Sequence, residues 1–149
     1  MACLNVIFLT DAKYQIIPDG MQVALFVSVV LLLLVQGVIP QELASRILAA
    51  GVVMAPILAL FLVTRGKGMG FADVKLSLTI GFLLGIKSGL LALYIGFLVG
   101  AVIGVFLLLS GHKKLKSRIA FGPFLIVGMI LMLFWNEQVF VFIHRLYGF

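Results

Sequence analysis

Residues 90–109 read LLALYIGFLVGAVIGVFLLL, a run of twenty residues without a charged side chain. Twenty helical residues rise about 30 Å, the thickness of a bilayer's hydrocarbon core, so this run predicts a transmembrane helix. Gly96, Gly100 and Gly104 recur every four residues within it. Such a repeat of small residues lets a neighbouring backbone approach closely, so the run also predicts tight helix packing.

The composition of the whole chain indicates lipid as its solvent. Hydrophobic residues make up 64% of the 149 residues and charged residues only 11%, whereas soluble proteins average about 45–50% apolar and 25% charged residues. The net charge is +6. Because the basic residues lie in short gaps between apolar runs, they favour loops that face a cytoplasm over a nucleic-acid surface. We expect the bilayer as a partner and no nucleic acid.

The other apolar runs complete an all-α fold, a polytopic bundle of transmembrane helices. Further spans are predicted at residues 21–39, 47–64, 71–87 and 119–135. Together with the first run they give about five full spans in a single membrane-embedded domain over residues 1–149. Two of these helices carry small residues every four positions, which predicts smooth contact faces: Gly51, Ala55 and Ala59, and Gly81, Gly85 and Gly89.

The first ten residues, MACLNVIFLT, are apolar but too short to cross a membrane. Ten helical residues rise about 15 Å. The segment lacks the basic region and small-residue cleavage site of a signal peptide. We interpret it as the last half of a truncated first helix, and we expect the chain to be a fragment or a product of late initiation.

The distribution of basic residues predicts the orientation. If the loop at Asp11 is cytoplasmic and each later run crosses once, loops on that side carry eight of the eleven lysines and arginines, and the far side carries three. This asymmetry agrees with the positive-inside rule. It also places Asp11 and Asp73 on the same, cytoplasmic side.

These two aspartates are the candidate catalytic residues. Asp11 follows an apolar segment and Asp73 begins one, and an ionisable group at the edge of a bilayer indicates function. Two carboxyl groups within hydrogen-bond reach share one proton. The ionised group can then take a proton from water while the protonated group hydrogen-bonds a peptide carbonyl, which is peptide hydrolysis without a metal.

Other interpretations of the same residues remain open. A single aspartate near a helix end is often a cap or an interfacial charge, and Asp19 is best explained as a cap. A carboxylate pair also fits a small proton-coupled transporter or channel. A non-catalytic membrane subunit or an inactive fragment is a further alternative. Cys3 is the single cysteine, and the two histidines, His112 and His144, lie far apart, so we expect no metal and no cofactor.

Three motifs resemble those of the type IV prepilin peptidases. Residues 11–19, DAKYQIIPD, resemble the first aspartate motif, in which proline (here Pro18) follows the aspartate by seven positions. Residues 68–76, GMGFADVKL, resemble the second motif, in which Gly-x-Gly-Asp-x-Lys surrounds the other aspartate. Residues 121–125, FGPFL, resemble a sequence that opens a late helix of the family.

The resemblance implies an aspartic endopeptidase of the cytoplasmic membrane, with Asp11 and Asp73 as the catalytic pair. Members of this family cut the short basic leader peptide from prepilins and pseudopilins on the cytoplasmic side. The remaining motif residues are expected to support the site: Gly68 and Gly70 keep the approach to Asp73 open, Lys75 meets lipid phosphate or biases the local field, and Pro18 and Pro123 shape the motifs.

The chain departs from the family pattern at two points. Ala72 stands where the family more often has glycine before the aspartate. Larger members carry an N-terminal region with paired cysteines, linked to N-methylation of the new pilin terminus, whereas this chain has only Cys3. We therefore expect peptidase activity without methyltransferase activity.

Overall fold

A computed structural model describes residues 19–35, 37, 40–66, 70–109 and 121–147. These residues form four helices, α2 (Asp19–Val35), α3 (Pro40–Thr64), α4 (Phe71–Leu109) and α5 (Gly122–Tyr147). The described part of the chain contains no strand. The predicted all-α class is therefore confirmed.

Three of the helices are long and apolar enough to cross a membrane, over Glu42–Thr64, Phe71–Phe106 and Gly122–Val141. The apolar part of α2, Gly20–Val35, is shorter. The prediction of about five full spans differs from this result, because α2 falls short and because α4, which is broken at Gly85, counts as a single span. The predicted truncated first helix lies outside the described residues.

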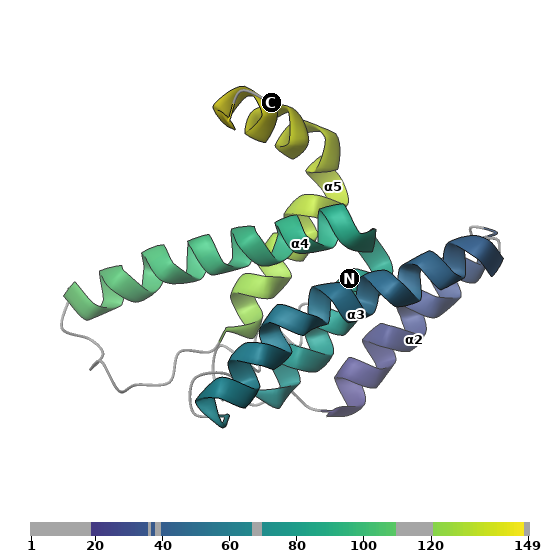
Figure 1. Cartoon of the computed structure of the whole chain (residues 1–149), viewed down its shortest axis with the longest axis horizontal. Coiled ribbons are helices and arrows are strands. Elements are labelled where there is room, and N and C mark those ends of the chain that lie inside the picture. The colour runs from purple at the N-terminus through teal and green to yellow at the C-terminus, as the bar shows by residue number, and fades with distance from the viewer. Residues whose placement is uncertain (1–18, 36, 38–39, 67–69, 110–120, 148–149) are drawn as a thin grey trace.

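Helix α4 is broken at Gly85, which has φ 82° and ψ −177°. This backbone conformation is open essentially only to glycine. Gly85 was predicted to line a helix face with Gly81 and Gly89, but it is instead the point at which α4 changes direction (Figure 1). A Cβ on Gly89 would lie 2.8 Å from Val53 Cγ2 of α3 and 3.4 Å from the Gly81 Cα, so the chain turns sharply at the break.

Arg46 of α3 binds the end of the first segment of α4. Its guanidinium donates through Nη1 to the carbonyl oxygens of Phe82, at 3.3 Å, and Leu83, at 2.5 Å. In an unbroken helix these two carbonyls would accept from residues 86 and 87, which lie beyond Gly85. The guanidinium therefore caps backbone acceptors that the break exposes.

Close backbone packing holds α3 and α5 against α4. A Cβ on Gly81 would lie 2.6 Å from the Ala49 carbonyl oxygen of α3, and a Cβ on Gly128 of α5 would collide with the Ala92 carbonyl oxygen of α4. A Cβ on Gly96 would lie 3.0 Å from the Phe124 carbonyl oxygen. The predicted close approach at the Gly96 repeat is confirmed, and the partner is α5.

The small-residue face of α3 behaves differently. Gly51, Ala55 and Ala59 are exposed, and a Cβ on Gly51 would meet no atom within 4 Å. The predicted close packing of this stripe is not found against any of the described helices. Helix α3 instead buries Ala49, Val53 and Ile57, so its contact face lies to one side of the predicted stripe.

A second break, at Trp135 in α5 (φ −123°, ψ 28°), lies next to the break in α4. The two are joined by a hydrogen bond of 3.1 Å from Ser88 Oγ to Asn136 Oδ1. After Trp135 the chain turns away from the bundle (Figure 1).

Helix α2 packs through Phe26 on Phe82 of α4, with ring centroids 5.4 Å apart. All three neighbours thus pack on α4.

We predict that Gly128→Ala destabilises the protein, whereas Gly51→Ala does not. Alanine is favoured over glycine in a helix by about 1 kcal/mol, so both substitutions gain the same propensity. Only the new Cβ at Gly128 meets backbone, and overpacking costs about 1–3 kcal/mol. Thermal unfolding of both variants in the same detergent measures the difference, and an equal or higher Tm for Gly128→Ala would contradict the packing described.

A separate prediction concerns the arginine at the break. Arg46→Met keeps the length of the side chain but leaves the Phe82 and Leu83 carbonyls without their donor, at a cost of about 1–3 kcal/mol. The apparent Tm should fall, and Arg46→Lys should recover part of the loss. Arg145→Met, at an exposed position of α5, is the matched control and should leave Tm unchanged. Equal effects at the two arginines would show that Arg46 has no capping role.

Candidate functional site

The loop before α4 is shaped by a tight end to α3. Arg65 (φ 49°) and Gly66 (φ 71°) both adopt left-handed backbone conformations. The Gly66 N–H donates to the Phe61 carbonyl oxygen at 3.0 Å, which satisfies one of the last carbonyls of α3. Residues 67–69 lie outside the described part, and α4 begins at Phe71.

Asp73 lies in the first turn of α4 and is only 6% exposed. The Gly70 N–H donates to Asp73 Oδ2 at 3.2 Å, and the Asp73 N–H donates to the Gly70 carbonyl oxygen at 3.1 Å. A side chain that returns to the residue before the helix in this way is half of a capping box. Asp73 therefore has the cap geometry that the sequence left open as an alternative, and its carboxylate is also buried.

Lys75 and Phe71 join this turn to α3. The Lys75 ammonium lies 5.3 Å from the centroid of the Phe71 ring, a cation–π contact. The Phe71 ring lies 5.6 Å from the Phe61 ring near the end of α3. The predicted roles of Lys75 toward lipid or toward the site remain predictions.

Gln22 ties the start of α2 to the same turn and was missed by the sequence analysis. Its Nε2 donates to the Ala72 carbonyl oxygen at 2.7 Å. Its other amide atom, Oε1, is buried and has no hydrogen-bond partner. An unpaired buried acceptor costs about 1–3 kcal/mol. The signal was present in the sequence, since Gln22 is an amide within the otherwise apolar start of a predicted span.

The starts of α2 and α4 therefore lie together, at the end of the bundle where α3 ends (Figure 1). Of the predicted site residues, Asp73, Gly70 and Lys75 are brought together by the first turn of α4. Asp11, Pro18 and Gly68 lie outside the described residues.

Pro123 belongs to the start of α5. The Phe121 carbonyl oxygen accepts from the N–H groups of Phe124 and Leu125, at 3.0 and 3.2 Å, so residues 121–125 open a helix, as predicted. Pro123 itself is buried. The Phe121 ring packs on Phe97 in the second segment of α4, with centroids 4.6 Å apart.

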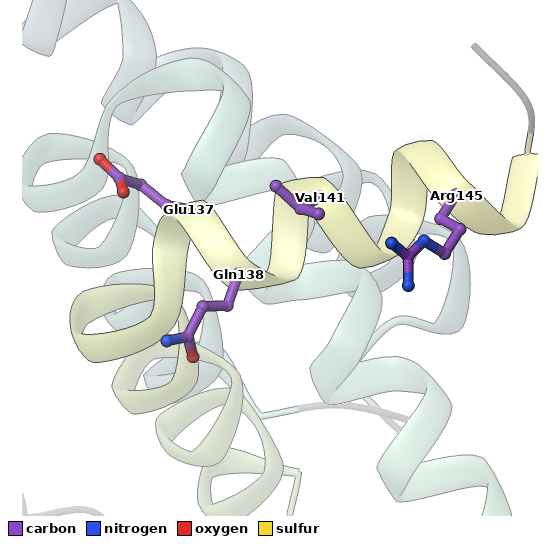
Figure 2. Close-up of a pocket in the computed structure, with 4 residues that line it drawn as sticks. All are labelled: Glu137, Gln138, Val141 and Arg145. Atoms are coloured by element: carbon purple, nitrogen blue, oxygen red, sulfur yellow. The ribbon is translucent and has the colours of Figure 1, made fainter.

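Two hollows lie near the breaks, away from the first turn of α4. One, of about 500 Å³, lies between α3 and the break in α4 and is lined by Glu42, Ser45, Arg46 and residues 84–88. The other, of about 360 Å³, follows α5 beyond its break. Figure 2 shows Glu137 and Arg145 at opposite ends of this second hollow, with Val141 between them.

Comparison with known proteins assigns the family. No curated protein and no solved structure matches the chain. A model of the type IV leader peptidase family matches residues 1–105. The match includes both Asp11 and Asp73 and ends before the FGPFL sequence at residues 121–125. Since it covers 105 of the 149 residues, the chain belongs to the type IV leader peptidase family.

Proposed function

We propose that the chain is an aspartic endopeptidase of the cytoplasmic membrane that removes the basic leader peptide from type IV prepilin or pseudopilin substrates. The observation that carries this proposal is the buried carboxylate of Asp73 at the start of α4, in a chain of the leader peptidase family. An ionisable side chain at the start of a membrane helix is costly and indicates a candidate functional site. A peptidase of this family would use such a carboxylate in its reaction.

The proposed reaction uses Asp73 together with Asp11. Close approach of two carboxyl groups leaves one protonated and one ionised. The ionised group takes a proton from water as the water oxygen attacks the scissile carbonyl carbon, and the protonated group hydrogen-bonds the carbonyl oxygen. The aspartate that took the proton from water then donates it to the leaving nitrogen as the C–N bond breaks. The products are a leader with a free carboxylate and a mature protein with a new amino terminus.

The link between α2 and α4 supports the participation of Asp11. Gln22 joins the first turn of α2 to residue 72, next to Asp73. Asp11 precedes the start of α2 by eight residues, a length of chain that reaches at most about 29 Å. The proposal places Asp11 within this reach, beside Asp73 and on the cytoplasmic side indicated by the basic loops.

The two roles of Asp73 can be separated by Asp73→Asn. The amide oxygen of asparagine still accepts from the Gly70 N–H, so the cap and the stability should be kept. An amide cannot exchange a proton in this reaction, so leader cleavage should fall by about 10²–10⁴-fold. Purified protein in detergent or liposomes, incubated with a prepilin that bears a basic leader, gives the rate. Asp11→Asn should have the same effect.

Glu137→Gln is the matched control, because Glu137 is an exposed carboxylate beyond the break in α5. Its cleavage rate should equal that of wild type. Cleavage by Asp73→Asn at the wild-type rate would show that Asp73 is a helix cap only. Failure of the wild type to cleave any leader-bearing substrate would overturn the proposed function.

A further inference from the structure

The side-chain oxygen of Gln22 accepts no hydrogen bond from the part of the chain that the structure describes. The side chain is 6% exposed, and its Oε1 is buried without a hydrogen-bond partner. It is the one such side-chain atom among the residues that the structure describes. Native proteins leave few buried polar groups unpaired, and each one calls for a structural or functional explanation.

The contact with the Ala72 carbonyl decides which way the Gln22 side-chain amide is turned. A carbonyl oxygen accepts hydrogen bonds and cannot donate them, so the NH₂ group of Gln22 must face the Ala72 carbonyl, 2.7 Å away. The oxygen of the same amide is then directed away from that bond. Since Ala72 immediately precedes Asp73, Gln22 presents an acceptor next to the turn that holds the Asp73 carboxylate.

A peptide substrate would supply the missing donor. Each residue of an extended leader peptide brings a backbone N–H, and in a site shielded from water every such group needs an acceptor. The two sides are complementary, because the turn has an unused acceptor and an incoming peptide has donors to satisfy. The carboxylates themselves are needed for the water and the scissile carbonyl.

We propose that Gln22 binds substrate, with its Oε1 accepting a hydrogen bond from one backbone N–H of the leader peptide near the scissile bond. The inference rests on the proposed peptidase function. Gln22 contributes to substrate binding and takes no part in proton transfer. Because Oε1 is covered in the free protein, the peptide reaches it by displacing the groups that cover it.

We expect Gln22→Met to weaken substrate binding without lowering the stability of the protein. Methionine has a similar length and no hydrogen-bonding group that is left unpaired, so the variant should unfold at the same temperature as wild type or higher. The KM for leader peptide should rise about three- to tenfold, the value of one hydrogen bond, with kcat nearly unchanged. Ser88→Ala is the control. It removes the hydrogen bond that joins α4 to α5 near their breaks, away from the starts of α2 and α4, and should leave KM unchanged.

The decisive experiment uses leader peptides N-methylated at one backbone nitrogen at a time. If Oε1 accepts from a particular N–H, methylation of that nitrogen should lower kcat/KM about three- to tenfold for wild type and leave Gln22→Met unaffected. Methylation at every other position should lower kcat/KM by the same factor for wild type and for Gln22→Met. This coupling between one substrate atom and one side chain is not expected from a role in folding alone.

The outcomes distinguish this inference from the function on which it rests. Equal penalties for the two enzymes at all positions would overturn the role of Gln22 and leave the peptidase intact. A markedly lower Tm for Gln22→Met, with KM unchanged, would show that the residue serves only to join α2 and α4. Absence of cleavage by wild type, with Asp73→Asn no different, would overturn both proposals.

Discussion

The break at Gly85 is the constraint on which the rest of the structure depends. Helix α4 has 39 residues, and a straight helix of that length would extend about 58 Å, nearly twice the hydrocarbon thickness of a bilayer. The left-handed conformation of Gly85 divides it into two segments, and the contact of Gly89 with Gly81 folds them together. The first segment packs on α3, and the second packs on α5 from Gly96 onward while its Gly89 still lies against Val53 of α3. The break therefore allows one helix to pack along two neighbours.

The break also creates a polar requirement, which the neighbouring helices satisfy. Arg46 binds the carbonyls that Gly85 frees, and Ser88 bonds Asn136 beside the second break. In lipid an unpaired backbone group costs several kcal/mol, so polar side chains at the breaks stabilise the fold. The polar groups thus lie at two ends of the bundle. Near the breaks Arg46 binds backbone carbonyls and Ser88 bonds Asn136, whereas the starts of α2 and α4 hold Asp73 and the Gln22 oxygen that has no partner among the described residues.

The features that could be predicted from the sequence are those set by neighbouring residues, and the features that could not depend on residues far apart in the chain. Hydropathy is a local property, so the all-α class and the long apolar helices were predictable. The close approach at Gly96 followed from a repeat within one helix. The similar repeat at Gly51, Ala55 and Ala59 proved to be exposed, because a smooth face does not specify a partner. Gly85 looked the same as Gly81 and Gly89, since a positive φ has no sequence signal beyond glycine itself. The Gln22–Ala72 bond joins residues 50 positions apart, beyond any local pattern.

Asp73 caps α4 and is also the proposed catalytic residue, and the two roles are physically compatible. A carboxylate near a bilayer needs hydrogen-bond donors, and a helix N-terminus offers free N–H groups and a favourable dipole. The Gly70 N–H bond to Oδ2 therefore holds the group in a defined orientation. The cap bond is made by Oδ2 alone, and a carboxyl group has two oxygens. A Cβ at position 70 would lie 3.6 Å from Asp73 Oδ2, an ordinary contact distance, so the space beside the carboxylate does not by itself require glycine there. In the proposed reaction this cap would also position Asp73, so the cap and the proposed catalytic role are compatible in one arrangement.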